Sequence, residues 1–301
     1  SWTDTIQASL MITALIVAPL MVIYNEGGVT ESMQIVEQLK PGANSLMGDL
    51  DTLAILSLAA WGLGYFGQPH IIVRFMAMRT PADAKSGRRI GISWMVLTVF
   101  GALSGAFMGI AYFARHPEAS LTNPETAESV FLDLAQILFH PLVAGLILAA
   151  VLAAIMSTLS SQLIVCSSAL VEDLYGIFSS KKLSASKSLW LGRAGVAIVA
   201  LVAGALAWNP NSSILQLVAF AWAGFGSAFG PTVLLSLYWR KLTTQGALAS
   251  MITGAVVAFA WGQSPMKSVL YEMVPGFASA LLVAIVVSLM TYKKNDAIDE
   301  E

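Results

Sequence analysis

Four residues near the middle of a long charge-free stretch are spaced so that an α-helix would bring them into one stripe. They stand at positions i, i+3, i+4 and i+7, and they are Ala154, Ser157, Thr158 and Ser161, with Ser160 beside them. A hard cation such as sodium binds several oxygen atoms, which a membrane helix supplies as hydroxyls and as loosened backbone carbonyls. One helix offers only a few such oxygens, so other ligands must come from another element. The alternative is ordinary hydrogen bonding between helices, at about 0.6 kcal/mol for each Ser or Thr.

A second stretch, WGLGYFGQPH at residues 61–70, interrupts an apolar run with three glycines and a proline. Irregular backbone at membrane depth needs protein or a watery cavity to satisfy its N–H and C=O groups, and transporters often build substrate sites at such breaks. Trp61, Tyr65 and Pro69 are four residues apart, so they share a face wherever the helix persists. This pattern predicts a substrate site with two aromatic rings beside free backbone groups. Alternatively, the glycines only allow close packing and the aromatics belong to the membrane-surface belt.

The elements that must position these residues are membrane-spanning helices. Hydrophobic residues make up 56% of the chain and charged residues only 11%, whereas soluble proteins carry about 25% charged residues. No stretch alternates polar and apolar residues as barrel strands do, so the predicted fold class is an all-α integral membrane protein. Windows of about 19 residues predict eight spans. Their ranges are 3–24, 53–78, 90–114, 141–171, 189–208, 214–239, 246–262 and 273–292.

Shorter features complete this division of the chain. Residues 128–139 are too few to span a bilayer and predict an interfacial or capping helix. The small-residue run at 221–231 predicts tight packing against the broken second span, with Trp222 and Ser227 as weaker candidates for lining a cavity. We expect residues 1–295 to form a single transmembrane domain and residues 296–301 a short cytoplasmic tail.

Basic residues predict the orientation of the spans. If all eight spans alternate, thirteen of the sixteen Lys and Arg residues fall on one side, and only Lys40, Arg115 and Lys267 fall on the other. The first side is therefore predicted to be cytoplasmic, and both ends of the chain lie there. The chain begins at Ser1 without an initiator Met, and a helix follows almost at once, so we expect it to be the later part of a longer protein.

Composition also argues against several classes of function. The formal net charge of -2 gives no indication of nucleic-acid binding, and one cysteine, Cys166, cannot form a disulfide framework. No nucleophile, base and orienting group can be assembled from the motifs, and no metal-binding motif is present. We therefore expect neither an enzyme nor an organic cofactor.

Three segments resemble the sodium:solute symporter family, and in particular its bacterial proline branch. They are SWTDTIQ at the start, WGLGYFGQPHIIVRFMA at the break and LAAIMSTLSSQLIVCSSALVEDLY in the fourth span. The resemblance implies the inverted-repeat fold of the bacterial leucine transporter, usually with thirteen spans in the proline branch. The eight spans predicted here would then be the sixth to thirteenth. The missing N-terminal spans would include an unwound helix that carries further sodium ligands.

The resemblance also implies roles for individual residues. A main sodium ion would be held by the carbonyl of Ala154 and the hydroxyls of Ser157 and Thr158, while Trp61, Tyr65 and Pro69 would help to form the proline site. Asp4 matches an acid that is important for sodium in the family. Some relatives place a second sodium ion between this acid and two serines, which here are Ser160 and Ser161. Proline carriers with Cys at position 161 lack one of these oxygens.

The function that these features predict is sodium-coupled uptake of L-proline by alternating access, in a multi-pass protein of the bacterial plasma membrane. Sodium is the expected coupling ion, and the lipid bilayer and the missing spans are the expected partners. Two alternatives stay open. One is a symporter of the same family for another amino or carboxylic acid, and the other is a transporter-like sensor module of a signalling protein.

Overall fold

The computed structural model describes residues 2–45, 48, 50–119, 121–122, 127–174, 185–208 and 213–293, and within these residues every regular element is a helix. The side chains of residues 3, 4, 172–174 and 185 are not described. The α-helices are α1 (Trp2–Asn25), α2 (Val29–Leu39), α3 (Thr52–Ala60), α4 (Pro69–Met76), α5 (Pro81–Arg115), α6 (Val130–Leu138), α7 (Pro141–Ser168), α9 (Ala185–Ala207), α10 (Ile214–Tyr238), α11 (Thr244–Gly262) and α12 (Met273–Thr291). Shorter elements are the 3-10 helices η1 (Trp61–Gly67) and η3 (Pro265–Ser268) and the π-helical turn η2 (Ala169–Leu174). The all-α prediction is confirmed.

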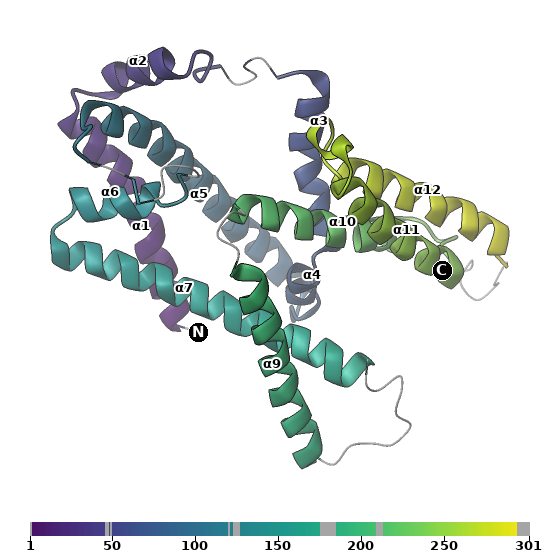
Figure 1. The fold of residues 1–301 in the computed structure, drawn as a ribbon. Helices are drawn as coiled ribbons and strands as arrows, with labels where there is room; N and C mark the ends of the chain where they lie inside the picture. The colour runs from purple at the N-terminus through teal and green to yellow at the C-terminus, as the bar shows by residue number, and fades with distance from the viewer. Residues whose placement is uncertain are drawn as a thin grey trace. The chain divides into compact units, whose positions relative to one another are not determined.

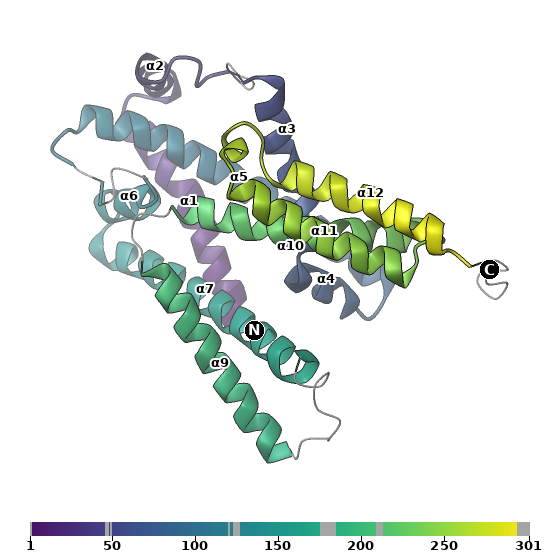
Figure 2. The same ribbon diagram turned by 45° about the vertical axis from the view of Figure 1, so that its right-hand side comes forward.

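The chain divides into two compact units. Figures 1 and 2 label their helices. Unit 1 comprises Ser1–Gly48 and Thr80–Asn209, and unit 2 comprises Asp49–Arg79 and Pro210–Glu301. The hydroxyl stripe belongs to unit 1 and the broken span to unit 2. Each unit has its own packing and is described by itself.

In unit 1, α1 packs against α5, α6 and α7, and α9 packs against α7. The core contains Ala14, Ala135 and Ile147 in one cluster and Val22, Met108 and Leu134 in another. The short helix α6 confirms the prediction of a separate helix at 128–139. Its buried Asp133 accepts hydrogen bonds from the hydroxyls of Thr122 and Ser129. Burial alone would raise the pKa of Asp133, but these bonds and the Thr122 backbone N–H hold it below its usual value.

A group of charged side chains, which we call the charged clasp, ties the corner between α1 and α2 to the end of α5. It consists of Glu26, Glu31, Arg115, His116 and Glu118. Arg115 donates to the backbone carbonyl of Glu26 and to the carboxylate of Glu31, the latter at 3.0 Å. The two ring nitrogens of His116 lie 2.9 Å from Glu26 and 2.9 Å from Glu118. These bonds hold α2 in place, although α2 itself was not predicted from the sequence.

In unit 2, α10, α11 and α12 lie side by side, as Figure 2 shows. Small residues bring their backbones together: a Cβ on Gly254 would lie 2.0 Å from the carbonyl oxygen of Ser227. Ser250 donates to the carbonyl of Ala280 across the α11–α12 contact at 3.0 Å. Close backbone approach and occasional hydrogen bonds between helices are typical of membrane bundles, where lipid removes most of the hydrophobic drive for helix association.

Seven helices are long and apolar enough to cross a membrane, and they correspond to seven of the eight predicted spans. The remaining prediction, 53–78, is divided among α3, η1 and α4, of which Thr52–Gly67 forms a shorter apolar helical stretch. The predicted discontinuity is thus confirmed, whereas the total of eight spans stays a prediction. Helix α5 begins at Pro81, nine residues before the predicted span, because Thr80 caps it by accepting a hydrogen bond from the N–H of Asp83.

Candidate functional site

The hydroxyl stripe lies on α7, as predicted, beside a groove of about 430 Å³ within unit 1. Ala154 and Thr158 line this groove opposite Met11 of α1. Ser157 is exposed on the same helix but does not line the groove. The carbonyl and hydroxyl oxygens predicted to bind sodium are therefore on one helix, and part of the set faces open space.

Hydrogen bonds divide the stripe into two pairs of hydroxyls. Ser160 donates to the carbonyl of Met156 at 2.7 Å, and Ser161 donates to the carbonyls of Ser157 and Thr158 at 3.1 and 2.9 Å. The hydroxyls of Ser157 and Thr158 have no hydrogen-bond partner among the described residues. None of the four hydroxyls bonds to another helix within the described part of the chain, so the alternative of interhelical hydrogen bonding finds no support there.

The other predicted member of a sodium site, Asp4, cannot be placed against this stripe. Its backbone belongs to α1, but its side chain lies outside the described residues. The two serines proposed to accompany it, Ser160 and Ser161, are consecutive residues of α7.

The break in unit 2 consists of a tightened helix followed by a single extended residue. Helix α3 continues into η1, and the backbone then turns at Gln68, whose φ and ψ are -87° and 110°. Pro69 imposes this geometry, because a proline disfavours the helical region for the residue before it and suits the first position of a new helix. The break lies where the sequence motif predicts it, for a local steric reason.

The four-residue spacing of Trp61, Tyr65 and Pro69 does not align these residues. A 3-10 helix has 3.0 residues per turn rather than 3.6, so residues four apart no longer stand above one another. Trp222 of α10 brings the two aromatics together instead. Its ring stacks on Trp61 with centroids 5.6 Å apart and meets Tyr65 edge-on at 4.9 Å. Tyr271 also stacks on Trp61, at 6.2 Å.

Hydrogen bonds join the break to the neighbouring helices. The indole N–H of Trp222 donates to the carbonyl of Trp61 at 3.0 Å, and the amide of Gln68 donates back to the carbonyl of Trp222 at 3.3 Å. Tyr271 donates through its hydroxyl to the carbonyl of Ala219 at 2.6 Å, and its N–H donates to the hydroxyl of Ser57. A reciprocal pair thus fixes η1 on α10, as buried irregular backbone requires.

Two of the three glycines in the break are needed for this contact. A Cβ on Gly64 would lie 1.9 Å from the indole nitrogen of Trp222, and one on Gly67 would lie 2.4 Å from the carbonyl oxygen of Phe225. A Cβ on Gly62 would meet nothing within 4 Å. Close packing therefore accounts for Gly64 and Gly67, while Tyr65 stays 45% exposed.

The two weaker candidates, Trp222 and Ser227, differ in their surroundings. Trp222 is the centre of the aromatic group, whereas Ser227 is completely buried between helices. Gln68 and Tyr271 were missed. Gln68 carries the one side-chain amide of the motif at residues 61–70, and Tyr271 is a polar aromatic residue just before a predicted span. Both residue types could have indicated a side chain that forms hydrogen bonds near the break.

These features define a class of protein: a multi-pass helical membrane protein with one discontinuous span. Residues 1–254 match the sodium:solute symporter family, and the chain belongs to that family.

Several bacterial transporters are similar to the whole chain. A sodium/proline symporter of Escherichia coli is 50% identical over 290 residues, which cover 96% of this chain and 58% of that protein. A sodium/proline symporter of Salmonella typhimurium is 49% identical over 300 residues, covering 100% of this chain and 60% of the relative. The high-affinity proline transporter PutP of Bacillus subtilis is 46% identical over 301 residues, or 63% of its length. The chain thus spans about three-fifths of the length of these relatives.

A solved structure of a Na⁺-coupled sialic acid symporter, in a substrate-bound outward-open state, has the same fold. Its TM-score is 0.71 over 98% of this chain and 62% of that one, at 16% sequence identity. The fold is therefore the leucine-transporter-like fold of sodium symporters.

Proposed function

We propose that the full-length protein containing this chain is a sodium-coupled symporter that takes up L-proline by alternating access. The observation that carries the proposal is that the hydroxyls of Ser157 and Thr158 have no hydrogen-bond partner among the described residues, in a chain of the sodium:solute symporter family. Proline as the substrate is supported by the names of relatives that are 46–50% identical over nearly all of this chain.

Sodium is the coupling ion in this proposal. It binds the carbonyl of Ala154 and the hydroxyls of Ser157 and Thr158, and the remaining ligands come from segments beyond these 301 residues. Thr158 lines an open groove, which leaves room for such a segment. Because the two hydroxyls have no protein partner among the described residues, binding sodium breaks no existing hydrogen bond. No organic cofactor is required.

A second sodium ion is a further part of the proposal, with Asp4, Ser160 and Ser161 as its ligands. Two serines on adjacent positions of α7 support it. Their hydroxyl protons already point to backbone carbonyls, so their oxygen lone pairs remain available to a cation. Two sodium ions a few ångströms apart repel each other, and the ionised Asp4 would offset this repulsion.

The substrate site comprises Trp61, Tyr65 and Pro69, with Trp222 and Tyr271 as positioning residues. An apolar ring such as that of proline packs well on aromatic side chains, and Tyr65 offers an exposed ring together with a hydroxyl. The start of α4 at Pro69 would place the positive end of a half-helix near the carboxylate of the amino acid.

Sodium and proline are coupled in this proposal because both bind to conformations of the same alternating-access cycle. Sodium stabilises the outward-open state, proline then favours closure, and rocking of the bundle releases both to the inside. The coupling is reciprocal, so each solute raises the affinity of the other by the same factor. A factor of about 100 corresponds to about 2.7 kcal/mol.

For the location we propose the bacterial plasma membrane, with both ends of the chain cytoplasmic. Support comes from the thirteen basic residues that fall on one side of the predicted spans against three on the other. Residues 1–295 would form one transmembrane domain. Residues 296–301, the proposed tail, lie outside the described part of the chain.

A second candidate function is sodium symport of another amino or carboxylic acid. The sialic acid symporter favours it, because the same fold there serves a different solute. Competition of labelled proline uptake by a panel of amino and carboxylic acids distinguishes the two. If proline is the substrate, unlabelled proline should inhibit the uptake of labelled proline most strongly. Stronger inhibition by another solute would identify that solute as the preferred substrate.

The central test is sodium-driven uptake of labelled proline by the full-length protein in proteoliposomes. Ser157→Ala and Thr158→Ala each remove a ligand oxygen, and we expect the half-saturating sodium concentration to rise about ten-fold or more, since ten-fold corresponds to about 1.4 kcal/mol. Ser236→Ala is the matched control, because that hydroxyl donates to the carbonyl of Val233 in its own helix. Unchanged sodium dependence in both stripe variants would contradict the site assignment.

A further inference from the structure

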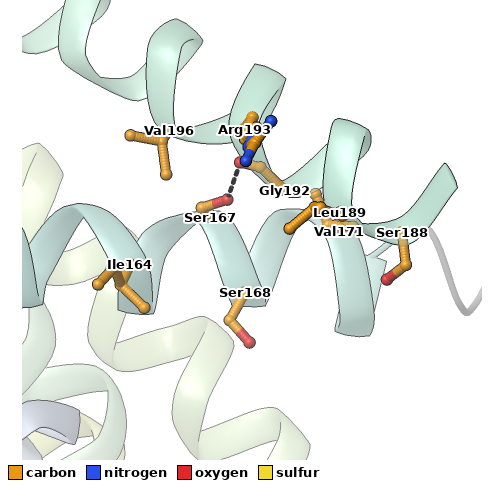
Figure 3. Close-up of a pocket in the computed structure, with 9 residues that line it drawn as sticks. All are labelled: Ile164, Ser167, Ser168, Val171, Ser188, Leu189, Gly192, Arg193 and Val196. Carbon is orange, nitrogen blue, oxygen red and sulfur yellow. Dashed lines mark hydrogen bonds between the residues drawn. The ribbon is translucent and has the colours of Figure 1, made fainter. Parts of the chain in front are cut away.

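A groove of about 710 Å³ lies between α7 and α9 in unit 1, away from the residues considered above. The two helices touch at Ser167, which is 3% exposed and donates to the carbonyl of Gly192 at 2.7 Å. A Cβ on Gly195 would lie 2.7 Å from the hydroxyl oxygen of Ser167, so the contact is close. Figure 3 shows Ser167 and Gly192 facing each other, with the other lining residues on either side of this contact.

The lining of this groove is apolar along the helices and polar near one end. Apolar surface comes from Ile164, Val171, Leu189 and Val196. Polar groups come from two serines, Ser168 and Ser188, and from Arg193. A groove that joins an apolar wall to a cationic group fits an amphipathic ligand with an anionic end. Its volume falls in the range of about 300–1,000 Å³ that is usual for small-molecule sites.

Arg193 carries the charge that such a ligand would meet. Its guanidinium carbon lies 5.4 Å from the ring centroid of Trp190, one turn earlier on the exposed side of α9. No carboxylate of the described residues lies within salt-bridge distance of this arginine. Tryptophan and arginine together are typical of the interface between hydrocarbon and headgroups, and a guanidinium binds phosphate through two hydrogen bonds. The sequence of α9 contains Lys187 and Arg193 and no acidic residue. The acidic residues of the neighbouring turn η2 are Glu172 and Asp173, whose side chains lie outside the described residues.

We propose that this groove binds one anionic phospholipid from the surrounding leaflet. The phosphate is held by Arg193, and an acyl chain lies along Leu189, Ile164 and Val196. The predicted orientation places Arg193 at the cytoplasmic surface, where basic sites between membrane helices bind anionic headgroups. The bound lipid would fill this groove between α7 and α9, beside the close contact of the two helices at Ser167. It would thereby stabilise the helix that carries the hydroxyl stripe.

The test is native mass spectrometry of the full-length protein in detergent, titrated with phosphatidylglycerol and with phosphatidylcholine of the same acyl chains. We expect phosphatidylglycerol to bind more tightly and Arg193→Gln to weaken its binding about five-fold, since one basic residue near an anionic surface has an effect of this order. Arg193→Lys keeps the charge and should retain most of the affinity. Lys187→Gln is the matched control, because it removes the same charge from the same helix outside the groove.

Several outcomes would overturn the proposal. If the two lipids bind equally tightly, the groove has no preference for an anionic headgroup. If Arg193→Gln and Lys187→Gln weaken the binding of phosphatidylglycerol equally, the lipid responds to the overall charge of the protein and not to Arg193. If neither lipid binds to the full-length protein, another part of that protein occupies the groove. Inorganic phosphate at matched concentration must not displace the lipid, because displacement would show a phosphate site without lipid specificity. A monodisperse elution profile confirms that each variant is folded.

Discussion

The hydroxyl stripe on α7 and the break in η1 both interrupt an apolar helix with polar groups, but they differ in how those groups are satisfied. At the break, the reciprocal bonds between Trp222, Trp61 and Gln68 pair the loosened backbone with α10. On the stripe, Ser157 and Thr158 have no partner among the described residues. The break is therefore held against α10 by hydrogen bonds. The stripe carries two hydroxyls that the described residues leave without a hydrogen-bond partner, which is why we propose it as the sodium site.

The largest effect that this comparison predicts comes from filling the space at Gly64. Gly64→Ala places a Cβ 1.9 Å from the indole nitrogen of Trp222, so the indole or η1 must shift, and we expect proline uptake to be abolished and the melting temperature to fall. Overpacking of this kind costs about 1–3 kcal/mol. Gly62→Ala is the matched control, since a Cβ there meets nothing within 4 Å. Similar behaviour of the two variants would refute the close contact.

A smaller loss of stability and of proline affinity is expected when only the hydrogen bond from Trp222 of α10 to η1 is removed. Trp222→Phe keeps an aromatic ring but leaves the carbonyl of Trp61 without its donor, at a cost of about 1–3 kcal/mol in the free energy of unfolding. The affinity for proline should fall because the aromatic group loses its fixed geometry.

The control for that variant is Trp208→Phe, because Trp208 is 87% exposed. Thermal unfolding and the KM for proline are the measurements. If Trp222→Phe and Trp208→Phe lower stability equally, the reciprocal bond is not what fixes the break.

The stripe responds differently, through the ion rather than through stability. Ser161→Cys removes a hard oxygen ligand of the proposed second sodium ion while preserving size. We expect a sodium-dependence curve of proline uptake with a Hill coefficient above one in the wild-type protein and nearer to one in this variant. A coefficient near one in both proteins would eliminate the second sodium site and leave the first site untouched.

The smallest expected effect concerns the charged clasp, which is built from titratable side chains, whereas the hydrogen bonds of Trp222 with Trp61 and Gln68 join neutral groups. Hydrogen bonds to Glu26 and then to Glu118 raise the pKa of His116 above its ordinary value of 6.5. The other groups that face this ring are Tyr112, which stacks on it at 4.4 Å, and the neighbouring Arg115, which pairs with Glu26. Protonation therefore favours the folded clasp. Its stabilising effect is complete below the ordinary pKa and disappears as the pH rises through the raised value.

Hydrogen exchange of the amides of α2 measures this effect when each rate is corrected for the intrinsic pH dependence of exchange. Protection should fall as the pH rises through the raised pKa of His116, and His116→Gln should remove that dependence. The amides of α11 serve as the internal control. Equal pH dependence in α2 and α11 would show that the clasp has no specific role.

Local rules explain which parts of the fold could be predicted from the sequence. Seven spans follow from apolar length, and the break follows from the effect of Pro69 on Gln68. Helix α2 was missed because its 11 residues are too polar and too short for a search based on spans, although Ser32 and Val36 form a buried face. The early start of α5 was missed for a similar reason, since its first turns carry Lys85, Arg88 and Arg89 outside the apolar run.

The amino-acid sequence by itself determined the helical class, the position of the break and the hydroxyl stripe, because each depends on residues within one or two turns of each other. Only the tertiary structure decided which polar groups are satisfied. The donor to the carbonyl of Trp61 stands 161 residues away in Trp222, and no local pattern encodes such a pairing. Spacing predicted that Trp61 and Tyr65 would meet on one helical face. They meet instead on Trp222, because the tighter turn of η1 rotates them apart and the close approach of α10 brings them together.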